Sequence, residues 1–345
     1  MMTPALKETA AALVARGKGL LAMDESSHTA NERFAEAGIP RTEDRRRVWR
    51  DLIVTTPGLG DCVSGAIMFD ETLRQTTLAG VPFAEALSKI GVIPGIKVDA
   101  GAKPLAGHPG EGLTEGLDGL RGRLAEYAGM GARFAKWRAV IAIGPDLPSR
   151  ACVAANARGL ALYAALCQEA GLVPIVEPEV LMTGDHTMER CRIVTGETLR
   201  TVFAHLHEQG VELDGIILKP GMVLPGAGRG ERAGVEAVAA ATLRTLLDAV
   251  PAPVAGIAFL SGGQTGEEAC AHLNAINRQV RARPFGAPWP LTYSFARAIQ
   301  HPALTLWAGD DANRPVAQHA LLHRARCALA ALHARYDPAM EREAA

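Results

Sequence analysis

The stretch VPIVEPE at residues 173–179 combines a short apolar run with two carboxylates at its end. Side chains alternate between the two faces of a β-strand, so Glu177 and Glu179 lie on the same face. Short runs that are apolar almost throughout are typical of parallel strands that are covered on both sides. This stretch therefore predicts a buried parallel strand with a charged end.

Similar apolar runs recur along the chain, and longer helix-like segments separate them. With residues 173–179 they give eight predicted strands, the others being residues 20–24, 63–69, 93–99, 134–140, 215–220, 254–261 and 291–296. Helices are predicted at residues 116–129, 149–170, 231–249 and 313–335. This alternation indicates an α/β fold, a single (β/α)8 TIM barrel over residues 1–345. An open doubly wound sheet is the alternative, but no G-x-G-x-x-G sequence follows an early strand.

The composition indicates an ordinary globular protein. Of the 345 residues, 48% are hydrophobic and the formal net charge is -1, which argues against a disordered chain. The 36 basic residues are balanced by 37 acidic ones, so we expect no nucleic-acid binding driven by bulk charge. The sequence shows no run of about 18 apolar residues and no export signal, so we expect a cytoplasmic protein that binds no membrane. The polar, Ala-rich residues 338–345 are predicted to form a mobile C-terminal tail.

Ionisable residues lie in or just after most of the predicted strands. In a barrel the carboxyl ends of all strands meet at one rim, where active sites lie, so we expect these side chains to converge in one polar pocket. Purely structural ion pairs are the alternative, but burying so many charges is costly. The residues are Asp24, Lys97, Asp99, Lys136, Arg138, Glu177, Glu179, Lys219 and Arg297.

Lysine is rare in this chain, since it supplies only seven of the 36 basic residues. Three of the seven, Lys97, Lys136 and Lys219, belong to the predicted rim. An amine can attack a carbonyl as a nucleophile, whereas a guanidinium cannot replace it. Lys219 follows an apolar run and is expected near Lys136, so the sequence predicts an amine nucleophile at Lys219. A solvent-directed lysine at the end of a strand is the alternative.

A second kind of site is predicted at LSGGQ, residues 260–264, which follows the seventh strand. Its small residues leave backbone N–H groups open to an anion, and barrel phosphate sites commonly follow strands 7 and 8. Arg297 follows the eighth strand and offers a forked partner for phosphate. The sequence thus predicts phosphate binding at Ser261, Gly262 and Arg297, with a plain turn as the alternative.

Metal binding is not expected. No close ligand pair accompanies His186, and His205 and His207 point in different directions along a helix, so these are predicted to be surface histidines. The six cysteines form no C-x-x-C pair and are expected to be free thiols. We therefore expect neither a metal nor another cofactor.

Seven motifs in order resemble class I fructose-bisphosphate aldolase, the Schiff-base type: GKGLLAMDES, GIKVDAG, FAKWR, PIVEPE, LKPGM, FLSGGQ and LTYSFARA. The resemblance extends from about residue 17 to residue 336. It implies a single barrel, a homotetramer and a lyase of glycolysis and gluconeogenesis. Such an enzyme reversibly cleaves fructose 1,6-bisphosphate to dihydroxyacetone phosphate and glyceraldehyde 3-phosphate through a lysine Schiff base and an enamine.

The same resemblance implies catalytic roles at the rim. Lys219 matches the Schiff-base lysine, Glu177 the acid and base, and Glu179 its paired neighbour. Lys136 matches a group that assists imine formation, and Asp24 matches the carboxylate that orients the C4 hydroxyl.

The resemblance also implies residues that bind the substrate. Lys97 and Arg138 match cations of the active site. Ser261, Gly262 and Arg297 match the 1-phosphate site, and Arg33 matches a residue near the 6-phosphate.

The chain departs from the family pattern in three places. Glu32 stands where a basic residue is common, Phe295-Ala296 replaces the common Tyr-Gly, and the C-terminal tyrosine of animal members is missing. These departures leave an aldolase for another phosphorylated ketose as an alternative. A non-catalytic scaffold is a further alternative, although an intact set of site charges argues against it.

Overall fold

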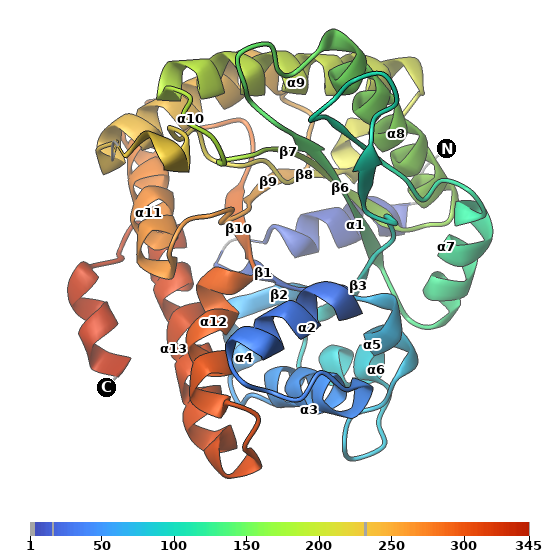
Figure 1. Ribbon diagram of the computed structural model, residues 1–345, viewed down its shortest axis with the longest axis vertical. Helices are drawn as coiled ribbons and strands as arrows, with labels where there is room; N and C mark the ends of the chain where they lie inside the picture. The colour runs from blue at the N-terminus through green and yellow to red at the C-terminus, as the bar shows by residue number, and fades with distance from the viewer. Residues whose placement is uncertain (1–3, 16, 231–232, 345) are drawn as a thin grey trace.

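The computed structural model describes residues 4–15, 17–230 and 233–344. Its parallel strands close into a barrel in the order β1-β10-β9-β8-β7-β6-β3-β2 (Figure 1). These strands are β1 (Gly19–Met23), β2 (Val63–Met68), β3 (Ile93–Lys97), β6 (Phe134–Ile141), β7 (Val173–Val180), β8 (Ile217–Leu218), β9 (Gly256–Phe259) and β10 (Leu291–Phe295). The predicted (β/α)8 barrel is therefore confirmed.

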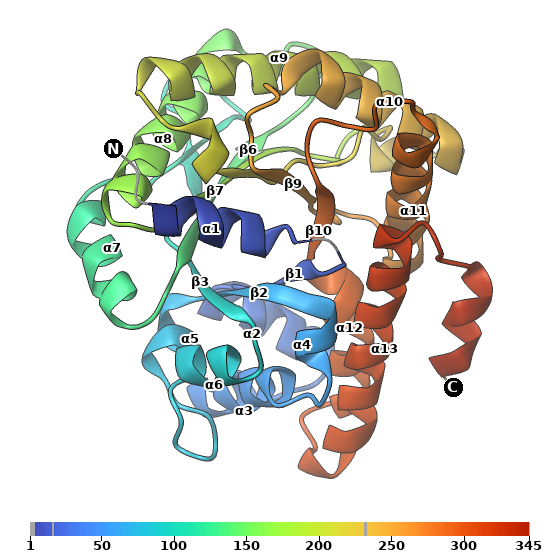
Figure 2. The same ribbon diagram turned by 180° about the vertical axis from the view of Figure 1, so that it is seen from behind.

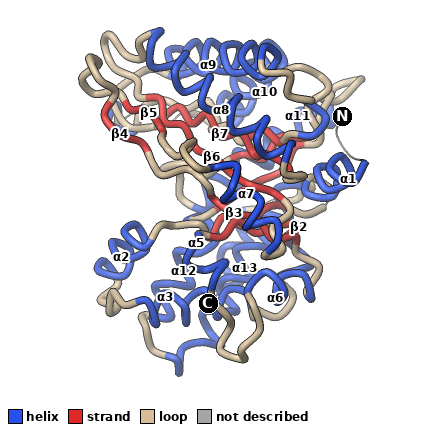
Figure 3. Tube along the Cα trace, turned by 90° about the vertical axis from the view of Figure 1, so that its right-hand side faces the viewer, coloured by secondary structure: helices blue, strands red, loops and turns tan. Residues whose placement is uncertain are grey.

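Helices surround the barrel (Figures 1 and 2). They are α1 (Pro4–Leu13), α2 (Ser27–Glu36), α3 (Glu43–Val54), α4 (Leu59–Cys62), α5 (Asp70–Arg74), α6 (Phe83–Lys89), α7 (Leu120–Gly129), α8 (Arg150–Glu169), α9 (Met188–Glu208), α10 (Val235–Ala249), α11 (Gly266–Ala282), α12 (Arg297–Trp307) and α13 (Arg314–Leu332). Short 3-10 helices are η1 (Leu213–Gly215), η2 (Ala227–Arg229), η3 (Asp311–Asn313) and η4 (Pro338–Ala344). An antiparallel hairpin, β4 (Ala102–Pro104) and β5 (Gly112–Thr114), follows β3, and Figure 3 shows it on the opposite side of the molecule from α1.

The amino end of the barrel is closed by apolar packing. Helix α1 crosses this end in Figure 2, and its buried Leu6 and Leu13 belong to the same apolar cluster as Leu20 of β1 and Phe134 of β6. Gly95 of β3 leaves room for the Phe134 ring, because a Cβ at this glycine would lie 2.2 Å from the ring. The charged strand ends are therefore confined to the carboxyl rim.

The helix boundaries follow local capping signals. Ser149 caps α8 by accepting a hydrogen bond from the Cys152 N–H at 3.1 Å, as the predicted helix at 149–170 requires. The predicted helix at 116–129 begins later, at Leu120, because Gly119 takes the left-handed conformation. Helix α10 begins at Val235 rather than at residue 231, and residues 231–232 lie outside the described residues.

The C-terminal segment lies beside α11 and α13, where η4 contacts both helices (Figure 1). The predicted mobility of residues 338–345 is a statement about dynamics and stays a prediction. None of the described helices combines the length and apolar character needed to cross a membrane.

Candidate active site

Four charged side chains from four strands form a continuous chain of contacts at the carboxyl rim. Lys219 follows β8, and its Nζ lies 3.1 Å from Glu177 Oε1 of β7. The other oxygen of Glu177 lies 3.2 Å from the Nζ of Lys136, which comes from β6. Lys136 Nζ also lies 2.6 Å from Oδ2 of Asp24, the residue after β1. All four residues are buried, so the contacts act in a medium of low polarity.

Electrostatics keep two members of this chain charged. Burial alone would raise the pKa of Asp24, but the charges of Lys136 and Lys219 hold it well below its usual value. Burial alone would lower the pKa of Lys136, but Asp24 and Glu177 raise it well above the usual value. Lys136 is therefore a resident cation with two carboxylate partners. Among the described residues, Lys219 has a single carboxylate partner, so its amine takes part in fewer ion pairs than that of Lys136.

A second group of charges extends the site over β3, β6 and β7. Lys97 Nζ lies 2.9 Å from Oδ1 of Asp99, whose other oxygen accepts a hydrogen bond from the backbone N–H of Arg138 at 3.1 Å. The guanidinium of Arg138 pairs with Glu179. Burial alone would lower the pKa of Arg138, but Glu179, together with Glu177 and Asp99, raises it above its usual value, so the guanidinium stays charged. The two glutamates of β7 thus have different partners, although they share a face of the strand.

The residues predicted to bind phosphate also lie together. Arg297, the first residue of α12, donates a hydrogen bond from Nη2 to the carbonyl oxygen of Gly262 at 2.8 Å. Ser261 is buried, and its carbonyl accepts a hydrogen bond from Gln264 Nε2 at 2.9 Å. The Leu260 N–H donates to the carbonyl of Pro220 at 3.1 Å, which ties this loop to the residue after Lys219.

Among the described residues no side chain caps the start of α12, so those N–H groups of its first turn that have no helical partner can face an anion. Its N-cap residue is Ala296, the second residue of the Phe295-Ala296 replacement, with a φ of -107° and a ψ of -88°.

Sequence reasoning missed the environment of Arg33. Arg33 pairs with Glu25, and Arg50 Nη1 lies 2.7 Å from the other oxygen of that carboxylate. Burial raises the pKa of Glu25, but Arg50 and Arg33 lower it below its usual value. Gln300 Nε2 donates to the same carboxylate at 3.0 Å. The only signal in the sequence was the position of Glu25 next to Asp24.

Glu32 lies on the solvent side of α2. It pairs with His28 across one helical turn at 3.2 Å, and both side chains are exposed. The acidic replacement at this position therefore adds no carboxylate to the ion-paired group of Glu25, Arg33 and Arg50.

The histidines differ from the expectation at one position. His186 is buried rather than exposed, so the prediction of a surface residue was wrong there, and burial lowers its pKa. It lies in the loop after β7, where its carbonyl accepts a hydrogen bond from the Gly226 N–H at 2.8 Å. His205 pairs with Glu208 at 3.1 Å on α9, as a surface histidine does.

One group among the described residues has the spacing of a metal site. It consists of His323 and Cys327 of α13 and Glu341 of η4. The carboxylate of Glu341 is already paired with the guanidinium of Arg324, which disfavours a cation at this place. The six cysteines all lie within the described residues, where they are buried and form no disulfide bond.

Known proteins have a similar sequence and fold. The family model "Glycolytic: Fructose-bisphosphate aldolase class-I" matches residues 5–345. A probable fructose-bisphosphate aldolase class 1 of Xanthomonas campestris pv. campestris is 56% identical over 93% of this chain and 95% of that protein. The cytosolic fructose-bisphosphate aldolase 4 of Arabidopsis thaliana is 48% identical over 90% of this chain and 78% of that protein.

A solved structure agrees with these matches. The fructose-bisphosphate aldolase of Plasmodium falciparum, crystallised with TRAP and a small-molecule inhibitor, superposes with a TM-score of 0.93 and 44% identity. The match covers 96% of this chain and 95% of that chain. By sequence identity and by fold, this chain belongs to the family of class I fructose-bisphosphate aldolases.

Proposed function

We propose that this lyase cleaves fructose 1,6-bisphosphate through a Schiff base on Lys219. The observation that carries the proposal is the contact chain from Lys219 through Glu177 and Lys136 to Asp24. It places an amine beside a carboxylate that can move protons, and a fixed cation behind that carboxylate. Products are dihydroxyacetone phosphate and glyceraldehyde 3-phosphate, and the reaction is reversible.

The first half of the reaction builds an electron sink. The Lys219 amine adds to the C2 carbonyl of the open-chain sugar, and Glu177 delivers a proton to the hydroxyl that leaves as water. The product is an iminium, which carries a positive charge next to the C3–C4 bond. Lys136 supports this step by holding Glu177 and Asp24 in place with its permanent charge.

The second half breaks the carbon–carbon bond. The carboxylate of Glu177 takes the proton of the C4 hydroxyl, which Asp24 orients, and the C3–C4 electron pair moves into the iminium. Glyceraldehyde 3-phosphate leaves and an enamine remains on Lys219. A proton then adds at C3 from water or from an acid of the pocket, and hydrolysis frees Lys219.

The remaining cations hold the anionic ends of the substrate. Ser261, Gly262 and Arg297 form the 1-phosphate site, which is supported by the bond between Arg297 and Gly262. Lys97 and Arg138 supply charge beside the sugar. Arg33 serves the 6-phosphate end, where Glu25 pairs with it.

That last contact also favours a second substrate. Because the carboxylate of Glu25 competes with a phosphate for the guanidinium of Arg33, we propose that the enzyme accepts fructose 1-phosphate as well as the bisphosphate. Comparing kcat/KM for the two sugars tests this proposal, and a strong preference for the bisphosphate would contradict it.

We further propose a cytoplasmic homotetramer. Cytosolic relatives such as aldolase 4 of Arabidopsis thaliana support the location, although other relatives are named chloroplastic. The homotetramer rests on the resemblance to the family. Sedimentation analysis of the purified protein measures the assembly state directly.

Borohydride trapping tests the mechanism. Borohydride added with dihydroxyacetone phosphate reduces an iminium to a stable secondary amine, and peptide mass spectrometry then locates it. We expect the adduct on the LKPGM segment, and none in a Lys219→Arg variant. An adduct on Lys136 would overturn the assignment, and no adduct on any lysine would overturn the mechanism.

A further inference from the structure

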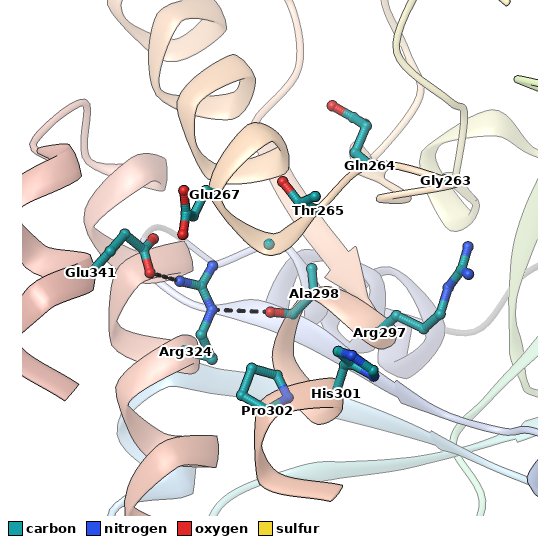
Figure 4. Close-up of a pocket in the computed structure, with 11 residues that line it drawn as sticks. Gly263, Gln264, Thr265, Glu267, Arg297, Ala298, His301, Pro302, Arg324 and Glu341 are labelled. Carbon is teal, nitrogen blue, oxygen red and sulfur yellow. Dashed lines mark hydrogen bonds and ion pairs between the residues drawn. The ribbon is translucent and has the colours of Figure 1, made fainter. Parts of the chain in front are cut away.

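A buried guanidinium joins three segments behind the phosphate loops. Arg324 of α13 donates from Nε to the carbonyl of Ala298 in α12 at 3.1 Å and from Nη2 to Cys270 Sγ in α11 at 3.4 Å. Its Nη1 pairs with the carboxylate of Glu341 in η4. Figure 4 shows this fork between Glu341 on one side and Ala298 on the other. One side chain therefore contacts two helices and the C-terminal segment.

The two helices start where the proposed 1-phosphate site lies. Helix α11 follows the loop with Ser261 and Gly262, and α12 begins with Arg297, one residue before the Ala298 carbonyl that Arg324 binds. The packing is tight at the start of α11. A Cβ added at Gly266 would lie 2.7 Å from Arg324 Nη2 and 2.9 Å from the Ala298 oxygen. The guanidinium thus fixes the distance between the first turns of the two helices.

The carboxylate partner is itself held in place. The Tyr336 hydroxyl donates to Oε1 of Glu341 at 2.7 Å, and the Tyr336 N–H donates to Asn274 Oδ1 in α11 at 2.9 Å. The end of the chain therefore returns to the helix that starts at the phosphate loop. A planar guanidinium with five fixed donors is suited to such a three-way contact, whereas an ammonium is not.

A cavity beside Arg324 has room for a second orientation of its side chain when the carboxylate of Glu341 is removed. It has a volume of about 320 Å³ and is lined by Thr265, Arg297, His301, Arg324 and Glu341, among others. Burying a guanidinium without its countercharge costs free energy, so an orientation that lets it hydrogen-bond to water or to another acceptor becomes favourable. Rotation of Arg324 into this cavity would remove the hydrogen bond to Ala298 and release the first turn of α12.

We propose that Arg324 is a positioning residue for the phosphate end of the active site, and that Glu341 of the C-terminal segment holds it in the working orientation. The inference rests on the proposed 1-phosphate role of Arg297. It couples the end of the chain to substrate affinity without bringing the tail into the active site. Neither Arg324 nor Glu341 touches the reacting atoms, so the effect falls on binding rather than on bond cleavage.

The test compares two carboxylates that line the same cavity in the full-length enzyme. Glu341→Gln removes the charged partner of Arg324. Glu267→Gln removes a carboxylate that lines the same cavity but for which Figure 4 draws no contact to Arg324. We expect Glu341→Gln to raise both KM for fructose 1,6-bisphosphate and the inhibition constant of inorganic phosphate by about three- to thirtyfold, with kcat unchanged. Glu267→Gln should leave all three values as they are.

A double-mutant cycle separates positioning from general destabilisation. If Glu341 acts through Arg297, then Glu341→Gln should add little to KM in an Arg297→Ala background. Arg324→Lys should recover part of the affinity that Arg324→Met loses, since an ammonium can still donate to Ala298. Lower melting temperatures with unchanged KM in the Glu341 and Arg324 variants would overturn the inference, as would full additivity in the cycle.

The same data distinguish the two proposals. If Arg297→Ala leaves KM unchanged, the assignment of the 1-phosphate site is wrong. If Arg297→Ala raises KM but Glu341→Gln and Arg324→Met do not, only the positioning role is wrong and the proposed function stands.

Discussion

Replacing each of the two glutamates of β7 in turn by glutamine gives the sharpest test of the site. Glu177 and Glu179 are both buried and lie on the same face of one strand. Glu177 contacts Lys219 at 3.1 Å and Lys136 at 3.2 Å, whereas Glu179 pairs with Arg138. Changing either residue to glutamine keeps the shape of the side chain and removes its ability to move a proton.

The expected losses differ in size. Glu177→Gln removes proton transfer at carbinolamine dehydration and at the C4 hydroxyl, which is worth about 10²–10⁴-fold in kcat. At about 1.36 kcal/mol per factor of ten, this is roughly 2.7–5.4 kcal/mol of barrier. Glu179→Gln removes an ion pair whose arginine is 42% exposed, and we expect kcat to fall less than about tenfold.

A coupled cleavage assay measures kcat and KM of both variants, and circular dichroism checks the fold. Folding should survive in Glu177→Gln, because Lys136 keeps its contact with Asp24 at 2.6 Å. The rate of borohydride trapping should also fall in Glu177→Gln and stay near the parent value in Glu179→Gln. Equal losses in the two variants, or the larger loss in Glu179→Gln, would refute the assignment of Glu177.

Three further predictions concern metal, the tail and pH. Prolonged chelation with EDTA should leave cleavage unchanged, and activity that is lost and then restored by zinc would contradict the lysine mechanism. Tyr336→Phe should change kcat less than about tenfold, because the Tyr336 hydroxyl binds Glu341 rather than substrate, and a larger loss with intact folding would indicate a proton donor in the tail. Burial lowers the pKa of His186 and His272 below the usual value of 6.5, so these imidazoles take up protons at a higher pH in the unfolded chain than in the folded one. The melting temperature should therefore fall as the pH drops below 6.5. His272→Asn should weaken this dependence of the melting temperature on pH. An unchanged dependence would contradict the lowered pKa of His272.

The sequence alone determined the class of fold and which charged residues lie at the carboxyl rim of the barrel. Apolar runs separated by helical patterns are local features, and they identified the barrel strands without knowledge of their neighbours. The alternation of side chains along a strand is equally local, and it placed Glu177 and Glu179 on one face. The rarity of lysine drew attention to Lys219 before any contact was known.

The partners of these charges were decided by the tertiary structure. In the register of β6 and β7, Lys136 lies opposite Ile175 and Arg138 lies opposite Glu177. The ion pairs are each displaced by two residues toward the carboxyl end, so Lys136 contacts Glu177 and Arg138 contacts Glu179. No periodicity in one strand encodes this displacement, because it depends on how far neighbouring strands are staggered.

The same limit explains the other features that sequence reasoning missed. Glu25 pairs with both Arg33 and Arg50, and Glu341 pairs with Arg324, so these contacts join segments that lie apart in the sequence. The burial of His186 likewise depends on segments that pack over it. Local patterns fix which face of an element a side chain occupies. Closure of the barrel, with its tilted and staggered strands, fixes which charge lies opposite. The strong distance dependence of charge interactions at low polarity then determines which groups form ion pairs.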